Sequence, residues 1–373
     1  MVYPITIAFS VFFAWLASRA KNKSVRILCS VISVLIPSIV GGLRQVGVGI
    51  DTLTYGAPDA FKASVSKSFL EFAAYREYKE LGYSFVCYVT MQTLGHINWC
   101  FFFYQLITVG CFYVGAYKHR KIAPLPFIMF IFLYMDWVNS FNIMRQCMAS
   151  SIIVMGIDHL EKKEYIKFMI YVIIAYLFHT SALVCIVLVL GIHMIVTHRS
   201  AYLRYFVILL IMLIILNFRT IIAIMFEFLK TWEAIPTRYQ GYMGGTDGNT
   251  DIGSRIRLLS YLGAYIIFCI YSRRGQKLLG GLNLEYYKFN TFLCFGLPFI
   301  LGGGIFSRLL GYNRSINYIV MAAMPFCVKD KYMRLLLILA VIFSLVGIGV
   351  KYRIGNASVS SGIDTYTYRS ILF

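Results

Sequence analysis

Arginine side chains occur in this sequence where a membrane helix would ordinarily be apolar. Arg145 and Gln146 lie in the run NSFNIMRQCMASSIIVMG, about one turn into an expected membrane helix. A charge in hydrocarbon costs from about 3 to more than 10 kcal/mol, so such a residue is expected to face a wet cavity and bind an anion. Arg44, which ends an apolar run, and Arg308, which follows three glycines, have similar settings. Because arginine offers a fixed fork of donors, the group predicts a phosphate or pyrophosphate site.

Two further side chains could handle a hydroxyl group near these arginines. Asp51 lies in GVGIDT and His179 in AYLFHTSAL. Histidine titrates near neutral pH and suits proton transfer, whereas an aspartate suits hydrogen bonding to a hydroxyl. Simpler interpretations stand beside these: an arginine can extend to lipid headgroups, Asp51 can bend its loop, and His179 can hydrogen-bond within a hairpin. The sequence shows no cluster of carboxylates and no spacing of histidines that would predict a metal site.

Composition determines the class of elements that must position these residues. The chain has 373 residues, of which 59% are hydrophobic and 14% charged. Apolar runs of about 15–20 residues recur along nearly its whole length, which predicts an all-α polytopic membrane protein of about 12 (12–14) spans in a single domain, 1–373. The expected spans are 2–19, 27–43, 98–117, 124–138, 140–159, 165–179, 180–196, 201–218, 255–272, 286–301, 305–327 and 332–350.

Basic clusters between the spans predict the sidedness. The net charge of +19 comes from short clusters that suit cytoplasmic loops and anionic lipid rather than nucleic acid. They are Arg19/Lys21/Lys23/Arg26, Lys118–Lys121, Lys162/Lys163/Lys167, His198/Arg199/Arg204, Arg273/Arg274/Lys277 and Lys329/Lys331/Arg334. All lie on one side if a single crossing separates residues 44 and 118, so we expect 82–95 to be a re-entrant half-helix broken at Gly95–Asn98. The alternative is a thirteenth span with one misplaced basic loop.

The outer side then holds the long polar segments. These are the loops 44–81 and 230–253 and the tail 351–373. Phe61, Val65, Phe69 and Phe72 fall at helical spacing in the first loop, which predicts one interfacial helix near 60–76.

Three motifs in order resemble the EpsG-type family of exopolysaccharide polymerases, relatives of Wzy-type O-antigen polymerases. They are GLRQVGVGIDTLTY (42–55), NIMRQCMASSI (142–152) and AYLFHTSAL (175–183); RYQGY (238–242) and the Arg308/Tyr312 region match more weakly. The resemblance implies a GT-C-like glycosyltransferase that joins polyprenyl-pyrophosphate-linked oligosaccharide units at the outer face of a bacterial inner membrane. It implies a reaction that needs no metal, cofactor or sugar nucleotide. It also implies that the protein works beside a flippase and a chain-length regulator. The extra glycine in GVGIDT departs from the usual spacing, which leaves the role of Asp51 open.

The resemblance and the residue types together assign roles. Arg145 is expected to hold the pyrophosphate, His179 to take the acceptor proton and Asp51 to position the acceptor. The other predicted pyrophosphate ligands are Arg44, Arg238 and Arg308, and the predicted sugar-binding residues are Gln146, Tyr55, Tyr83, Tyr239 and Tyr242. The rival functions are a transporter or flippase of lipid-linked sugars and an O-antigen-type ligase.

Overall fold

The chain is helical throughout the part that its structure describes. The computed structural model describes residues 2–198, 200, 202, 203, 206, 209, 284–295, 310–356 and 368–372, in which β-pairing is limited to isolated bridges. Three helices of this part are long and apolar enough to cross a membrane: α1 (Val2–Arg19), α2 (Lys23–Gly42) and α6 (Ile97–Lys118). The prediction of an all-helical membrane protein is therefore confirmed, whereas the count of about twelve spans and the GT-C-like architecture stay predictions.

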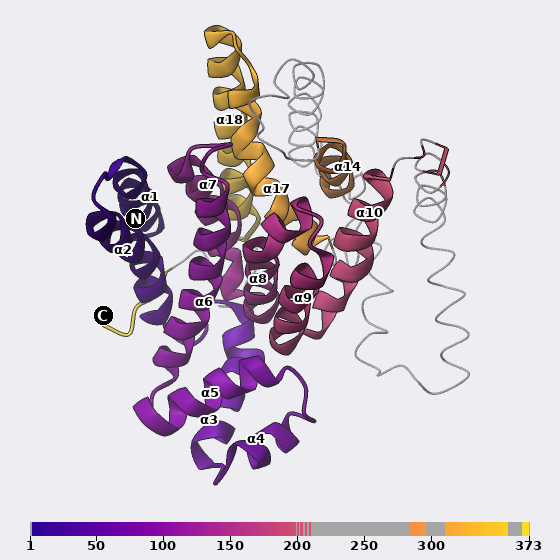
Figure 1. Cartoon of the computed structure of the whole chain (residues 1–373). Helices are drawn as coiled ribbons and strands as arrows, with labels where there is room; N and C mark the ends of the chain where they lie inside the picture. The colour runs from indigo at the N-terminus through magenta and orange to yellow at the C-terminus, as the bar shows by residue number, and fades with distance from the viewer. Residues whose placement is uncertain are drawn as a thin grey trace.

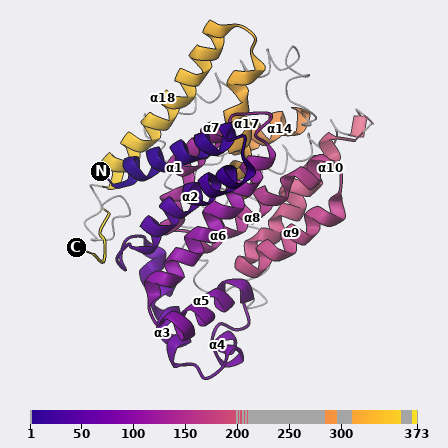
Figure 2. The ribbon, with the colours of Figure 1, turned by 60° about the vertical axis from the view of Figure 1, so that its left-hand side comes forward.

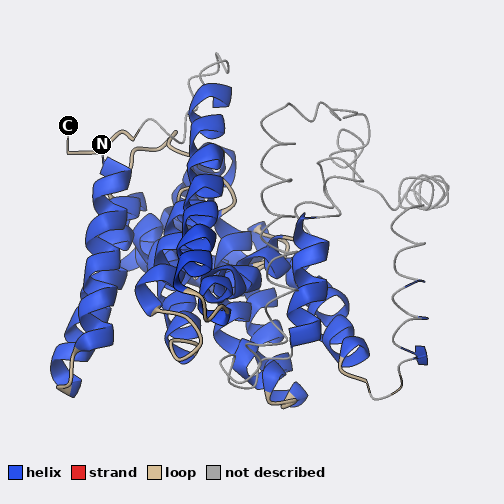
Figure 3. Cartoon of the chain, turned by 90° about the horizontal axis from the view of Figure 1, so that it is seen from above, coloured by secondary structure: helices blue, strands red, loops and turns tan. Residues whose placement is uncertain are grey.

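Most other expected spans in the described part coincide with further helices of the bundle (Figures 1 and 2). They are α7 (Leu125–Phe132) with the π-helix η2 (Leu133–Trp137), α8 (Met144–Glu161), α9 (Tyr165–Phe178), η4 (Thr180–Leu183), η5 (Ile186–Gly191), α10 (Ile192–Val196), α14 (Leu284–Phe295), α17 (Gly311–Ala323), η7 (Met324–Cys327) and α18 (Lys331–Asn356). Viewed from above, α1 and α2 flank one side of the bundle (Figure 3). The expected spans 201–218 and 255–272 and the loop 230–253 lie largely or wholly outside the described residues.

Helices α2 and α6 run antiparallel. Asn98, at the start of α6, donates a 2.8 Å hydrogen bond to the carbonyl of Arg44, just after α2, and Tyr113 near the end of α6 donates a 2.8 Å bond to Ser30 near the start of α2. The chain between Arg44 and Asn98 thus begins and ends at the same end of the bundle. A segment without a net crossing, as expected for 82–95, requires this arrangement.

The first three basic clusters gather at the opposite end. Lys118 at the end of α6 forms an ion pair of 2.7 Å with Asp158 near the end of α8, and His119 bonds Glu161 at 3.0 Å. Helices α6 and α8 therefore end together, beside the start of α2. We call this the basic end, and the end with Arg44 and Asn98 the site end.

Residues 44–95 fold into short helices at the site end, where α3 (Ala57–Val65), α4 (Phe69–Tyr75) and α5 (Leu81–Leu94) gather (Figure 1). Helix α5 has 14 residues and ends at Gly95, whose φ of +67° suits glycine, before α6 begins at Ile97. At 1.5 Å per residue it is about 21 Å long, shorter than the hydrocarbon core of about 30 Å. The half-helix prediction is consistent with this length.

The prediction of one interfacial helix near 60–76 is wrong. The chain breaks between Val65 and Phe69, because the hydroxyl of Ser68 caps a new helix by accepting from the amide of Glu71 at 3.2 Å. The apolar side chains consequently do not share a face. Phe61 is 71% exposed, whereas Phe72 is fully buried.

Small residues let the central helices approach closely. A Cβ added at Gly115 of α6 would lie 2.7 Å from the carbonyl oxygen of Val154 in α8. Such close backbone contacts are typical of membrane helix interfaces. They hold α8, and the site residues at its start, in a set position against α6.

The end of the tail folds back onto the site end. The amide of Gln45 donates to the carbonyl of Arg369 and that of Ile371 to Leu43, both at 2.9 Å. Tyr368 donates a further 2.9 Å bond to Val40 near the end of α2. Residues 368–372 therefore lie at the site end.

Candidate active site

Arg145 lies in the first turn of α8, which begins at Met144 and not several residues earlier as the sequence suggested. Residues 139–141 form a separate 3-10 turn, and Ile143 leaves the helical conformation with φ −128°. The arginine therefore stands in the first turn of its helix and not one turn further in. Its side chain is 23% exposed.

A single buried carboxylate organises the cations around Arg145. Glu80, with a side chain only 4% exposed, accepts a 2.6 Å hydrogen bond from His179 Nδ1 on Oε1. Its Oε2 pairs with the guanidinium groups of Arg145 and of Arg76, the latter at 2.9 Å. Arg76 also pairs with Asp59 at 3.1 Å. Residues from α3, the end of α4, the start of α5, the start of α8 and the α9–η4 hairpin thus meet in one cluster, which we call the Glu80 cluster.

The cluster is balanced in charge without a ligand. Two guanidinium groups face two carboxylates, and His179 adds one positive charge when protonated. Burial raises the pKa of Glu80, but the hydrogen bond from His179 and the charge of Arg145 outweigh it, so the net pKa lies below its ordinary value. For Asp59 burial dominates and raises the pKa, against the opposing charges of Arg76 and Arg145.

The backbone that presents Glu80 is strained. Glu77, Tyr78 and Glu80 have φ values of 52–53°, in the left-handed region that costs a non-glycine residue about 1–2 kcal/mol. The turn therefore relies on the ion pairs of Glu80 and Arg76 to hold it. Strain of this kind is concentrated at functional sites.

Tyr55 connects the Glu80 cluster to Asp51. The guanidinium carbon of Arg145 lies 3.8 Å from the centre of the Tyr55 ring, and the Tyr55 hydroxyl donates to Asp51. Asp51 also accepts from the backbone amide of Met144 at 3.1 Å, at the start of α8. Tyr55 belongs to the π-helix η1 (Thr52–Gly56), a conformation found frequently at functional sites.

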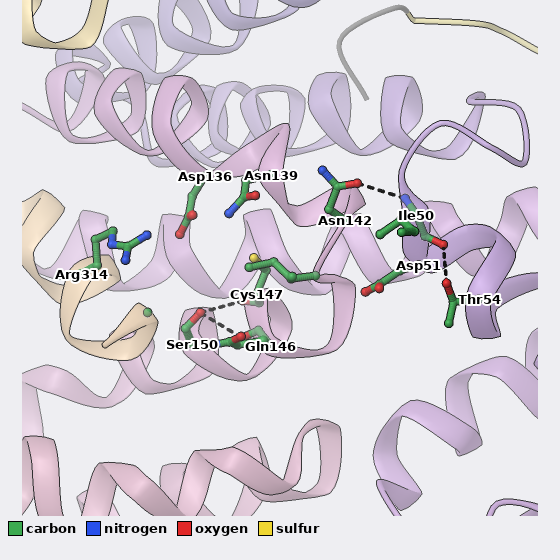
Figure 4. Close-up of a pocket in the computed structure, with 12 residues that line it drawn as sticks. Ile50, Asp51, Thr54, Asp136, Asn139, Asn142, Gln146, Cys147, Ser150 and Arg314 are labelled. Carbon is green, nitrogen blue, oxygen red and sulfur yellow. Dashed lines mark hydrogen bonds between the residues drawn. The ribbon is translucent and has the colours of Figure 1, made fainter. Parts of the chain in front are cut away.

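Asp51 also lines a cavity of about 500 Å³ (Figure 4). Asp136 and Arg314 lie at one end of it, Asp51 and Thr54 at the other, and Gln146 lies between them. The remaining lining residues are Ile50, Asn139, Asn142, Ile143, Cys147, Ser150 and Gly311. Seven of its twelve lining residues carry an amide, carboxylate or hydroxyl group, so the cavity can hydrogen-bond a ligand with many hydroxyl groups.

Arg44 lies away from the cavity. Its side chain is fully buried, with the guanidinium carbon 4.3 Å from the centre of the Phe101 ring and 4.4 Å from that of Phe141. It donates to the carbonyl of Gly41 and, at 3.1 Å, to the sulfur of Met144. In this arrangement the guanidinium packs inside the protein, beside the start of α8.

The remaining predicted sugar-binding and pyrophosphate-binding residues lie in different places. Tyr83 is fully buried and stacks on Tyr104 with ring centres 4.8 Å apart. Gln146 lines the cavity. The predicted ligands that lie outside the described residues are Arg238, Tyr239, Tyr242 and Arg308.

Sequence reasoning missed Glu80, Arg76, Asp59 and Arg314. The first three lie in a charged stretch that looks like an ordinary polar loop, and only the fold shows that they are buried. A carboxylate directly before the apolar run 81–94 was the one available signal. Within the described residues no group of three or more histidine, cysteine, aspartate or glutamate side chains could hold a metal ion.

Comparison with known proteins places the chain in a family. The model of the EpsG family matches residues 27–370, nearly the whole chain. No curated protein and no solved structure matches the chain. The matched region includes the Glu80 cluster and the cavity, and such a match indicates an exopolysaccharide polymerase of the membrane. The chain therefore belongs to the EpsG family.

Proposed function

We propose that this protein joins polyprenyl-pyrophosphate-linked oligosaccharide units at the outer face of a bacterial cytoplasmic membrane. The growing chain is transferred to the non-reducing end of the next unit, and polyprenyl pyrophosphate leaves. The observation that carries the proposal is the position of Arg145. It lies beside His179 and, across Tyr55 and Asp51, beside a polar cavity of about 500 Å³.

Arg145 is proposed to bind the pyrophosphate of the donor. Its side chain is 23% exposed and stands at the start of α8, so its guanidinium can be reached by a phosphate group. As the glycosidic bond breaks, negative charge grows on the pyrophosphate, and a fixed guanidinium stabilises that charge. Arg308 and Arg238 remain proposed additional ligands, whereas Arg44, whose side chain is fully buried, is proposed to add only its positive charge to the site.

The acceptor sugar is proposed to occupy the cavity. Gln146 and Asp51 would bind its hydroxyls, with Tyr55, Tyr83, Tyr239 and Tyr242 as proposed further sugar contacts. In the reaction the acceptor oxygen bonds to the anomeric carbon, the bond from that carbon to the phosphate oxygen breaks, and its electron pair leaves with the pyrophosphate. The acceptor proton passes to Nε2 of His179, the ring nitrogen opposite the one that Glu80 engages. The scheme uses no metal, cofactor or sugar nucleotide.

The test uses purified protein with a lipid-pyrophosphate-linked repeat unit, and the products are separated on a gel. Wild type should form a ladder of multimers, and Arg145→Ala should slow its formation about 100- to 1000-fold, the cost of losing one charge-stabilising donor. The matched control is Arg120→Ala, because Arg120 also stacks on a tyrosine, at 3.9 Å from the Tyr117 ring, but at the basic end.

Four results would contradict the proposal. A normal ladder from Arg145→Ala would exclude the pyrophosphate role, and full activity of His179→Ala would exclude proton transfer by that residue. Movement of the substrate across proteoliposomes without any multimer would favour a transporter. A single transfer of finished glycan would favour a ligase.

A further inference from the structure

We infer that Glu80 is a positioning residue that holds both Arg145 and His179, and that the substrate's pyrophosphate replaces Glu80 on Arg145. The inference rests on the proposed function and adds a residue and a competition to it. It starts from the one carboxylate that both predicted site residues share.

The geometry at His179 defines the tautomer. Glu80 Oε1 lies 2.6 Å from Nδ1, and an ionised carboxylate only accepts, so Nδ1 carries the proton. In the neutral imidazole Nε2 is then the nitrogen with a free electron pair. A carboxylate in this position fixes the orientation of a histidine base without touching the substrate.

The geometry at Arg145 sets up a competition. Glu80 Oε2 accepts a hydrogen bond from the terminal nitrogen Nη1 of Arg145. A phosphate oxygen would bind the same fork of donors. Arg76 also pairs with Oε2, so Glu80 keeps a cationic partner if Arg145 turns to a ligand. The negative charge of Glu80 therefore opposes binding of an anion beside it.

The strained turn makes this role specific to Glu80. The Glu80 side chain is 4% exposed and enters the cluster, whereas Glu77, in the same turn and with the same left-handed backbone conformation, has a side chain 72% exposed. Glu77 pairs with exposed Lys79. Glu77→Gln is consequently a matched control that removes the same charge a few residues away.

The first measurement is binding of a short-chain polyprenyl pyrophosphate, alongside turnover. Glu80→Gln should bind the lipid about fivefold or more tightly, because the competing charge is gone, and should turn over at least about tenfold more slowly, because the histidine is no longer oriented. Glu77→Gln should leave both values unchanged. A variant that is merely damaged would bind more weakly, so unchanged or weaker binding in Glu80→Gln overturns the inference. Glu80→Asp, which keeps the charge, should restore part of the turnover.

The second measurement needs no substrate. In protein labelled with ¹⁵N at histidine, the His179 signal, identified by its loss in His179→Asn, should report a proton on Nδ1 in wild type and a mixture of tautomers in Glu80→Gln. An identical tautomer in both proteins overturns the inference. If wild type fails to bind or polymerise the lipid, the proposed function fails, and this spectrum still decides whether Glu80 orients His179.

Discussion

Asp51 should stabilise the start of α8 as well as serve the cavity. Its carboxylate accepts from the Met144 amide at 3.1 Å and from the Tyr55 hydroxyl. Asp51→Asn keeps an oxygen acceptor but loses the charge. A hydrogen bond to a charged group contributes about 1.5–3 kcal/mol against about 0.5–1.5 for a neutral one, and a negative charge at a helix N-terminus contributes about 0.3–1 kcal/mol. We therefore expect Asp51→Asn to lower the free energy of unfolding by about 1–2 kcal/mol.

Asp51→Ala should cost more, because it leaves both donors without this acceptor. Each unsatisfied buried group costs about 1–3 kcal/mol. Asp51 is half-buried and lines the cavity, so water can replace part of the loss. The expected cost is therefore about 2–3 kcal/mol, which exceeds that of Asp51→Asn.

The assay is unfolding in detergent followed by intrinsic fluorescence, with polymer formation measured on the same samples. Asp330→Asn is the matched control, because Asp330 also accepts a helix N-terminal amide, from Met333 at 2.8 Å, but is exposed and remote from the site. Its activity should equal that of wild type, whereas both Asp51 variants should lose activity. Equal stability of Asp51→Ala and Asp51→Asn would refute the capping argument. Normal activity in Asp51→Asn would refute acceptor positioning by a charge.

Three further predictions concern pH, the tail and helix packing. The folded-state pKa of Glu80 lies below its ordinary value of 4.5, so its stabilising contribution is complete above that value and is lost as the pH falls through the folded pKa. The difference in unfolding midpoint between wild type and Glu80→Gln should therefore shrink in that acidic window. A difference that stays constant would contradict the lowered pKa of Glu80. Deletion of residues 368–373 removes the backbone pairing beside Arg44 and should cost about 2–4 kcal/mol, measured by the same unfolding assay, with an unchanged midpoint as the contrary result. Gly115→Leu should push α6 from α8 at the carbonyl of Val154 and cost at least about 1–3 kcal/mol, and a stability equal to that of wild type would show that the contact is not tight.

Several elements of the fold could be predicted because their signals are local. Apolar runs predicted α1, α2, α6 and α9 to within a few residues, since a helix that crosses hydrocarbon must be apolar over its own length. The clustering of basic residues predicted a segment without a net crossing between Arg44 and Asn98, and the antiparallel pairing of α2 and α6 agrees. The interfacial helix was mispredicted because a cap at Ser68 outweighs an apolar spacing that continues across the break.

The candidate site divides in the same way between sequence and tertiary structure. By itself the sequence determined the class of protein, its family and the unusual residues Arg145, Asp51 and His179, because residue type and local spacing carry that information. Only the tertiary structure decided that Glu80 joins Arg145 to His179, although His179 lies 99 positions from Glu80 in the chain. It also decided that Arg44 is buried between two aromatic rings. Burial turns an ordinary loop glutamate into the centre of a charged cluster, because a carboxylate removed from water must find cationic partners. Those partners are selected by helix packing in space, which no local pattern of residues records.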